Sequence, residues 1–174
     1  MSNSATKIAV LGATGYVGSR LISSLLSNGF LIRTLSRSTK KLTNRFNGFE
    51  KQLENLETDL TDESELSSQL SGCDVLIYLV HSMHTSGNKY DLVDDQLAIN
   101  TARAAKDAGV KRIIYLSGLG NPNEKLSKHL LSRHSVEDKL RTTGLPVTVL
   151  KAAMIIGSGS ASFEILRYLV ERLP

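Results

Sequence analysis

The stretch VLGATGYVGSRL, Val10 to Leu21, decides the fold, because it places three evenly spaced glycines between an apolar run and a helical pattern. The glycines are Gly12, Gly15 and Gly18, and the run KIAVL leads into them. A strand, a glycine-rich turn and an amphipathic helix in this order are typical of a site that holds a pyrophosphate at a helix amino end. The sequence therefore predicts a phosphate cradle at this turn.

Each glycine of the turn has an expected task. Gly12 ends the strand where the chain must turn sharply, Gly15 lets the backbone approach a phosphate, and Gly18 lets the helix pack tightly on the strand. The N–H groups and the positive dipole end of the helix add to the attraction for phosphate. The other residues of the turn that we expect to contact the bound molecule are Thr14, Tyr16 and Val17.

Strand and helix patterns alternate along the rest of the chain. Further strands are expected within about 30–36, 51–60, 74–80, 111–117 and 146–153. Further helices are expected at about 61–71, 90–108, 124–143 and 161–172, with a short basic helix or a loop at about 39–47. Parallel neighbours require such crossovers, so the predicted fold is α/β, a doubly wound parallel sheet with helices on both faces.

The sequence also predicts the buried face and the end of the first helix and the cap of the helix at about 61–71. The first helix should bury one face and stop at Asn28 and Gly29, and the helix at about 61–71 should be capped by Thr61. The residues expected on the buried face of the first helix are Val17, Leu21, Leu25 and Leu26.

Length and composition indicate one folded domain, which we expect to span residues 1–174 and to be truncated soon after its last helix. No apolar run reaches the roughly 18 residues of a membrane span, and the opening MSNSATK lacks a hydrophobic leader, which favours a cytoplasmic protein. Cys73, the one cysteine, permits no internal disulfide and is expected to be a small buried apolar residue.

The charge of +4 is unevenly distributed. Residues 1–49 contain no aspartate or glutamate but seven lysines and arginines. Such a basic segment suits a nucleic acid, an anionic membrane surface or a phosphorylated small molecule. Nucleic-acid binding is disfavoured, because aromatic residues make up only 5% of the chain and no base-stacking motif is present.

The residues after the second predicted strand indicate which dinucleotide fits the cradle. An NAD site usually has an acidic residue there to hold the ribose hydroxyls, but this chain has Ser36, Arg37 and Ser38. Arginine can bind a 2′-phosphate through two hydrogen bonds, and serine can donate to it. We therefore expect NADP(H) as the preferred cofactor, with NAD(H) possible. Arg33 should point away by strand alternation, and Lys40 and Lys41 can equally belong to a solvated surface.

Several motifs together resemble the short-chain dehydrogenase/reductase superfamily, in particular its extended and atypical, NmrA-like branches. They are the GxxGxxG spacing, DLTD from Asp59, DVLIYLVHS from Asp74, GVKRIIYLSGLG from Gly109 and LPVTVLKAAMIIGSGSASFE from Leu145. The last block, with YLVERLP, resembles the N-terminal domain of a bacterial subgroup of two-part NAD(P)-binding proteins. The resemblance implies that a substrate lobe and a C-terminal region lie outside this chain.

The resemblance also assigns positions around the cofactor. It implies that Asp59 and Leu60 contact the adenine and that Ser117 ends the fifth strand beside the crevice. The residues that it places at the ribose beside the nicotinamide are Leu79, Val80, His81 and Ser82. From its sequence context alone, Asp59 can equally cap the next turn.

The catalytic residues of the superfamily are not matched. The resemblance implies a serine after the fifth strand and a Tyr-x-x-x-Lys pair on the next helix, but His129 stands at the tyrosine position and Arg133 at the lysine position. The candidate catalytic residues are therefore Ser117, His129 and Arg133, and a standard ketoreductase mechanism is unsupported. His81 or His84 can contact a substrate, whereas the HxxH pair lacks the further ligands of a metal site, and no metal is expected.

Two functions remain open at this point. One is an atypical NADP(H)-dependent oxidoreductase that acts on an unidentified small molecule, with the cofactor carrying the hydride chemistry. The other is a non-catalytic NADP(H) sensor of the NmrA-like type. The fold alone does not separate them.

Overall fold

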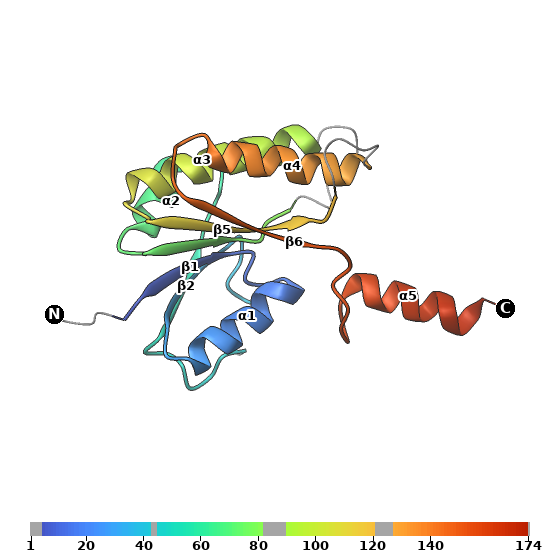
Figure 1. Cartoon of the computed structure of the whole chain (residues 1–174). Helices are drawn as coiled ribbons and strands as arrows, with labels where there is room; N and C mark the ends of the chain where they lie inside the picture. Colours follow the sequence, from blue (N-terminus) through green and yellow to red (C-terminus); the bar gives the residue numbers. More distant parts are fainter. Residues whose placement is uncertain (1–4, 43–44, 82–89, 121–126, 174) are drawn as a thin grey trace.

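The structure is a computed structural model that describes residues 5–42, 45–81, 90–120 and 127–173, the side chains at 90, 91 and 129 excepted (Figure 1). Within these residues the chain forms a six-stranded sheet in the order β3-β2-β1-β4-β5-β6. All of the paired strands run parallel. The predicted doubly wound parallel sheet is therefore confirmed.

The elements follow the predicted alternation closely. The strands are β1 (Lys7–Leu11), β2 (Leu31–Ser36), β3 (Leu53–Glu57), β4 (Val75–Tyr78), β5 (Arg112–Gly118) and β6 (Val147–Ala152). The helices are α1 (Tyr16–Ser27), α2 (Glu63–Leu70), α3 (Tyr90–Asp107), α4 (Lys128–Arg141) and α5 (Ala161–Arg172). The boundaries differ from the expected ones by a few residues at most, as is usual for helix and strand ends.

Helices cover both faces of the sheet, α2, α3 and α4 on one side and α1 on the other (Figure 1). The central strands are buried on both faces, so their side chains alternate between two apolar cores. Leu11, Tyr78 and Tyr115 belong to the core with α3 and α4, whereas Val10 and Ile77 belong to the core with α1. Cys73 is buried at 3% exposure, as predicted.

The buried face of α1 differs from the prediction. Ile22 and Leu26 are its fully buried apolar side chains, while Val17, Leu21 and Leu25 are only partly buried. Ile22 follows Gly18 and precedes Leu26 by four residues, so these three positions lie on one stripe of the helix. The stripe that meets the sheet is therefore centred on Ile22, which the predicted face omitted.

The expected cap of α2 also needs correction. Asp62, not Thr61, caps α2, because its side chain accepts a hydrogen bond from the backbone N–H of Glu65 at 2.9 Å. The segment at 39–47, for which the sequence left a short helix or a loop open, forms turns in its described part, which agrees with the loop. Leu42 and Phe46 from this segment are buried in the α1 core, so their apolar side chains fix it in place.

The last helix is set apart from the others. It extends away from the sheet in Figure 1, and none of its residues is buried. None of the helices in the described ranges is long and apolar enough to cross a membrane.

Candidate functional site

The order of the strands reverses between β1 and β4, because the chain builds outward from β1 in one direction and then resumes on its other side. Ligands of such sheets bind in the crevice outside the carboxyl ends of the strands at this point. Gly12 follows β1 there and Leu79 follows β4, and the N–H of Leu79 donates to the carbonyl oxygen of Leu11 at 3.0 Å. The predicted cradle therefore lies where a dinucleotide site is expected.

Gly12 is required by both its conformation and its surroundings. Its φ of 87° lies in the left-handed region that favours glycine. A Cβ on Gly12 would also lie 2.8 Å from the backbone oxygen of Leu79. The residue thus makes the sharp turn expected from the sequence and also lets the ends of β1 and β4 approach one another.

Gly18 and Gly15 have different environments. A Cβ on Gly18 would overlap the backbone oxygen of Gly12, so glycine permits the tight contact between α1 and the turn. Gly15 is exposed, and its N–H donates to the Gly12 oxygen at 3.1 Å. No side chain among the described residues caps α1, which leaves the start of the helix accessible beside the exposed Thr14.

Tyr16 packs against a distant part of the chain. The Arg20 guanidinium lies 3.7 Å from the centre of the Tyr16 ring and donates to the carbonyl oxygen of Ser158 at 2.9 Å. The Tyr16 hydroxyl contacts the backbone of Gly157 so closely that a Cβ there would overlap it. The Tyr16 side chain is therefore committed to the loop between β6 and α5, which leaves its backbone N–H as its group for a phosphate.

At the end of β2, Arg37 is exposed and lies between Ser36 and Ser38, which are joined by one hydrogen bond. Ser36 donates its hydroxyl hydrogen to the carbonyl oxygen of Ser38 at 2.9 Å. Arg33 points to the other side, where its Nε donates to Glu54 at 2.7 Å and its Nη1 to the carbonyl oxygen of Ser71 at 2.9 Å. The prediction that Arg33 turns away from the crevice is therefore confirmed.

Asp59 caps the turn that follows β3. Its Oδ1 accepts hydrogen bonds from the N–H and the hydroxyl of Thr61, at 2.9 and 2.8 Å. These two bonds lower the pKa of Asp59. Leu60 is half-buried beside it, and its carbonyl oxygen accepts from Asn100 at 3.3 Å. The turn-capping interpretation of Asp59 is thus confirmed, and the side chain remains exposed at the edge of the crevice.

Ser117 and His81 lie at the ends of β5 and β4. Ser117 is 4% exposed, and its hydroxyl oxygen has no hydrogen-bond partner of ordinary length among the described residues, although it interacts with the Tyr115 hydroxyl. The half-buried His81 ring lies 6.0 Å from the ring of Tyr115, and Leu79 and the half-buried Val80 precede it. Ser82, His84 and the side chain of His129 lie outside the described residues.

Arg133 of α4 reaches the same region. The Tyr115 hydroxyl donates to its carbonyl oxygen at 3.2 Å, and its Cγ would lie 3.8 Å from a Cβ on Gly118. Burial lowers the pKa of Arg133, while Tyr115 and the carboxylate of Asp94 oppose this shift. Sequence reasoning missed Asp94, an acidic residue of α3 that is only 8% exposed. No periodic signal distinguished it from the neighbouring Asp95.

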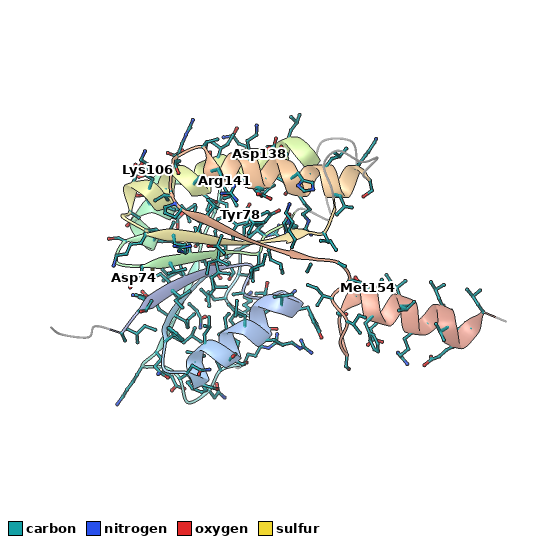
Figure 2. All side chains as sticks on the ribbon, in the orientation of Figure 1. Asp74, Tyr78, Lys106, Asp138, Arg141 and Met154 are labelled. Atoms are coloured by element: carbon teal, nitrogen blue, oxygen red, sulfur yellow. The ribbon has the colours of Figure 1, made fainter. Side chains whose placement is uncertain are left out.

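Two buried tyrosines of the sheet, Tyr78 and Tyr115, lie beneath this region. Tyr78 and Tyr115 are paired in the β4–β5 register, and their rings meet edge to face at 5.9 Å. Figure 2 places Tyr78 between the sheet and the helices α3 and α4. Burial raises the pKa of Tyr115 to about 12 and also raises that of Tyr78. Neither phenol is therefore expected to ionise near neutral pH.

The comparison with known families agrees with this geometry. Residues 12–167 match the sequence model of the NAD(P)H-binding family, which is most of the chain. The chain belongs to the NAD(P)H-binding family. The family match includes both the glycine turn after β1 and the ends of β4 and β5.

Known relatives cover the chain more fully than the chain covers them. The mitochondrial protein fmp52 of Aspergillus niger is 27% identical over 166 residues, which are 89% of this chain and 69% of that protein. Cinnamoyl-CoA reductase 1 of Oryza sativa is 29% identical over 126 residues, which are 67% of this chain and 36% of the reductase. This member of the NAD(P)H-binding family thus spans about a third of the plant reductase it matches.

Solved structures share the fold. The NADPH-dependent quinone oxidoreductase of Escherichia coli, complexed with NADPH, is 28% identical with a TM-score of 0.67. The match covers 83% of this chain and 48% of that one. The Bordetella bronchiseptica enzyme WbmH, in complex with NAD+, is 18% identical with a TM-score of 0.73 over 95% of this chain and 62% of its own. The second likeness concerns the fold alone.

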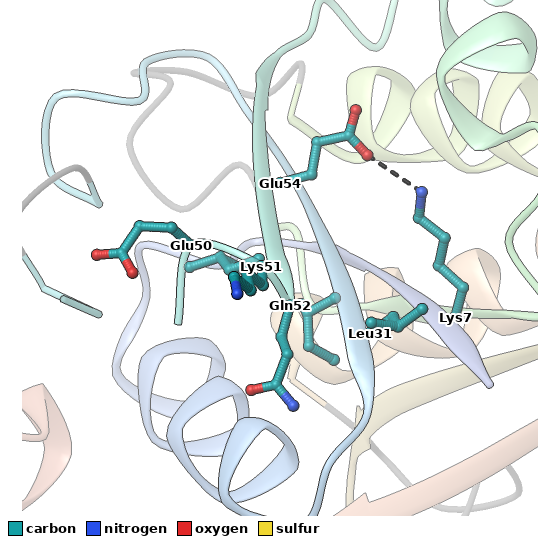
Figure 3. Close-up of a pocket in the computed structure, with 8 residues that line it drawn as sticks. Lys7, Leu31, Glu50, Lys51, Gln52 and Glu54 are labelled. Carbon is teal, nitrogen blue, oxygen red and sulfur yellow. Dashed lines mark hydrogen bonds and ion pairs between the residues drawn. The ribbon is translucent and has the colours of Figure 1, made fainter. Parts of the chain in front are cut away.

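A hollow at the opposite end of the sheet is unrelated to this site. It measures about 160 Å³ and lies at the amino ends of β1, β2 and β3, where Lys7 pairs with Glu54 at 3.2 Å (Figure 3). It is lined by Leu31, Ile32 and residues 50–54 together with Lys7. Because phosphate-binding turns follow the carboxyl ends of parallel strands, this hollow is not the dinucleotide site.

Proposed function

We propose that the chain is the NADP(H)-binding domain of an atypical short-chain oxidoreductase that acts on an unidentified small molecule. The observation that carries the choice of NADP(H) is the exposed Arg37 at the carboxyl end of β2, where an NAD site would present a carboxylate. The quinone oxidoreductase that binds NADPH is among its similar structures, which supports this preference.

The proposed contacts follow the crevice from one end of the cofactor to the other. The pyrophosphate would be held by backbone N–H groups and by the helix dipole. The residues proposed there are Gly12, Thr14, Gly15, Tyr16, Val17 and Gly18. Those proposed at the 2′-phosphate are Ser36, Arg37 and Ser38, those at the adenine are Asp59 and Leu60, and those at the nicotinamide ribose are Leu79, Val80, His81 and Ser117.

Coulomb's law gives the size of the attraction between Arg37 and a 2′-phosphate. A pair of unit charges about 4 Å apart interacts by roughly 4 kcal/mol at an effective dielectric of 20, before desolvation is subtracted. Solvent screening at this exposed side chain reduces the net gain, and even a third of that value would be about tenfold in affinity.

The bound cofactor would supply the hydride, and the residues of this chain would orient the reacting groups. Ser117 offers a buried hydroxyl that forms no hydrogen bond of ordinary length among the described residues, which suits a hydrogen bond to a substrate oxygen or to the ribose. Arg133 would hold the nicotinamide ribose with its cation, as lysine does in the superfamily, while Asp94 balances its charge. The substrate-binding part of the protein is proposed to lie outside residues 1–174, since the relatives are longer.

The second candidate is a non-catalytic NADP(H) sensor of the NmrA-like type. The sequence favours it, because His129 stands at the position of the tyrosine that transfers the proton in the superfamily. Tyr115, which lies in the same region, is buried and donates its hydrogen to the carbonyl oxygen of Arg133, so it does not take over that role.

The experiment that tests the cofactor preference is a titration of NADPH and NADH with the variant Arg37→Asp. We expect NADPH affinity to fall by about tenfold or more and NADH affinity to change little, because only NADPH carries the 2′-phosphate. Lys51→Asp, which changes the charge equally at the opposite end of the sheet, is the control. Equal losses for both cofactors in Arg37→Asp would show that Arg37 does not bind the 2′-phosphate.

Oxidation of NADPH by the longest form of the protein, assayed with carbonyl and quinone substrates, separates the two candidate functions. Turnover with any of them supports the oxidoreductase. Tight NADPH binding without turnover supports the sensor.

A further inference from the structure

Residues 1–49 contain no acidic residue, but in the folded chain an acidic residue from the next strand lies beside them. The register of β2 and β3 pairs Ser36 with Glu57 at the carboxyl ends of both strands. The sheet thereby brings a carboxylate from the next strand to the loop that carries Arg37. The sequence alone does not show this proximity, because Glu57 comes 20 positions after Arg37.

Glu57 binds the far end of that loop. Its Oε1 accepts hydrogen bonds from the backbone N–H of Thr39 at 3.0 Å and from the Thr39 hydroxyl at 3.2 Å. The near end is held by the N–H of Thr58, which donates to the carbonyl oxygen of Ser36 at 2.9 Å. Arg37 lies between two points at which the loop is fastened to β3 and its following residue.

The position of Glu57 is itself supported from behind. Gln69 of α2 donates from its Nε2 to the carbonyl oxygen of Glu57 at 2.8 Å and to Glu65 at 2.9 Å. Its Oε1 accepts from the hydroxyl of Thr58. The acceptor for Thr39 is therefore held on a strand whose backbone is fixed by a helix.

We propose that Glu57 is a positioning residue for the 2′-phosphate site, because its carboxylate holds the Ser36–Thr39 loop in the shape that presents Arg37 to the crevice. This inference rests on the proposed function and deepens it. In an NAD site the carboxylate accepts hydrogen bonds from ribose hydroxyls. In this chain Ser36 and Arg37 stand at that position, and the nearby carboxylate of Glu57 comes from the end of β3, where its Oε1 accepts hydrogen bonds from two groups of Thr39.

The charge and the hydrogen bonds of Glu57 have opposite effects on a phosphate. The negative charge repels the 2′-phosphate, whereas the bonds to Thr39 organise the loop that attracts it. Glutamine in place of Glu57 keeps an acceptor oxygen and removes the charge. Alanine removes both, so the two variants separate the contributions.

The probes are adenosine 2′,5′-bisphosphate and 5′-AMP, which differ by the 2′-phosphate, titrated against the wild type, Glu57→Gln and Glu57→Ala. We expect Glu57→Ala to weaken the bisphosphate about threefold to tenfold relative to 5′-AMP, and Glu57→Gln to keep or raise the wild-type ratio. Glu50→Ala, which removes another exposed carboxylate beside Gly48, should leave the ratio unchanged. An unchanged ratio in Glu57→Ala, or a loss of 5′-AMP binding in Glu57→Gln, would overturn the proposal.

Amide hydrogen exchange separates failure of this inference from failure of the NADP(H) preference. If the wild type favours 5′-AMP over the bisphosphate, the cofactor preference is wrong and Glu57 has no 2′-phosphate site to position. The exchange of the Thr39 N–H should be faster in Glu57→Ala than in the wild type or in Glu57→Gln. Unchanged exchange in Glu57→Ala would show that Glu57 does not hold the loop, whichever cofactor binds.

Discussion

The hydroxyl of Tyr115 donates a hydrogen bond to the backbone carbonyl oxygen of Arg133 at 3.2 Å. This bond joins the middle of β5 to the centre of α4 beneath the candidate crevice. It fixes the position of Arg133 along β5. It thereby also fixes the position of the Arg133 guanidinium, which we propose as a contact of the nicotinamide ribose.

Tyr115→Phe should therefore lower the free energy of unfolding by about 1 kcal/mol, since the ring is retained and one buried hydrogen bond is lost. The variant should also change how the free energy of unfolding depends on pH in alkaline solution. Because the folded pKa of about 12 exceeds the ordinary value near 10, the tyrosine ionises first in the unfolded chain, and stability falls as pH rises between these values. Tyr115→Phe should show a shallower fall in urea denaturation over this range.

Tyr168→Phe is the matched control, because Tyr168 is 58% exposed on α5. Its stability should equal that of the wild type at neutral pH. A loss as large as that of Tyr115→Phe would contradict the assignment of the effect to the bond with Arg133.

Gly18→Ala should disrupt the cradle, because its Cβ would overlap the backbone oxygen of Gly12 and neither backbone can move without shifting α1 from β1. We expect a loss of about 1–3 kcal/mol in stability and at least a tenfold loss in NADPH affinity. Thermal denaturation and a fluorescence titration of NADPH measure the two effects.

Gly29→Ala provides the comparison for that variant. Gly29 has a φ of 81° and nothing within 4 Å of a Cβ, so alanine there adds backbone strain of about 1–2 kcal/mol without overlap. Cofactor affinity should be kept in Gly29→Ala. If both variants lose it alike, general destabilisation and not the contact with Gly12 explains the result.

Asp74 should contribute to stability at neutral pH and lose that contribution in acid. Lys111 donates to its Oδ1 at 2.6 Å and the N–H of Lys7 to its Oδ2 at 3.0 Å, and these bonds lower its pKa, with that of Lys111 having the larger effect. A lowered folded pKa means that the stabilisation is present above the ordinary value near 3.9 and is lost as pH falls through the folded value.

Denaturation between about pH 5 and pH 2 should therefore show a shallower decline in Asp74→Asn than in the wild type. Asp138→Asn is the control, since Asp138 is exposed and has no ion pair within the ranges that the structure describes. If stability falls as steeply with decreasing pH in Asp74→Asn as in the wild type, the bonds to Lys7 and Lys111 do not govern the loss of stability in acid.

The sequence was sufficient for the sheet and for the glycine turn, because both depend on local patterns. Apolar runs and glycine spacing are properties of neighbouring residues, and Gly12 adopts the positive φ that its sharp turn requires. Strand alternation was enough to turn Arg33 away from the crevice. These features need no knowledge of which strands are adjacent.

The features that the sequence did not reveal are contacts between distant segments. Glu57 reaches Thr39 only because β3 pairs with β2, and Asp94 faces Arg133 only because α3 packs beside α4. The error over the cap of α2 has a related cause. Thr61 is engaged by Asp59 in the preceding turn, so Asp62 is the residue left to cap the helix.

The contact between Arg20 and Ser158 sets an order of events during synthesis. The ribosome adds Ser158 138 residues after Arg20, so this side of α1 lacks its neighbour until that length of chain has been made. Such long-range contacts form late and slow the approach to the native state. A nascent chain that stalls before the loop between β6 and α5 would thus carry the glycine turn with its Tyr16 side uncovered.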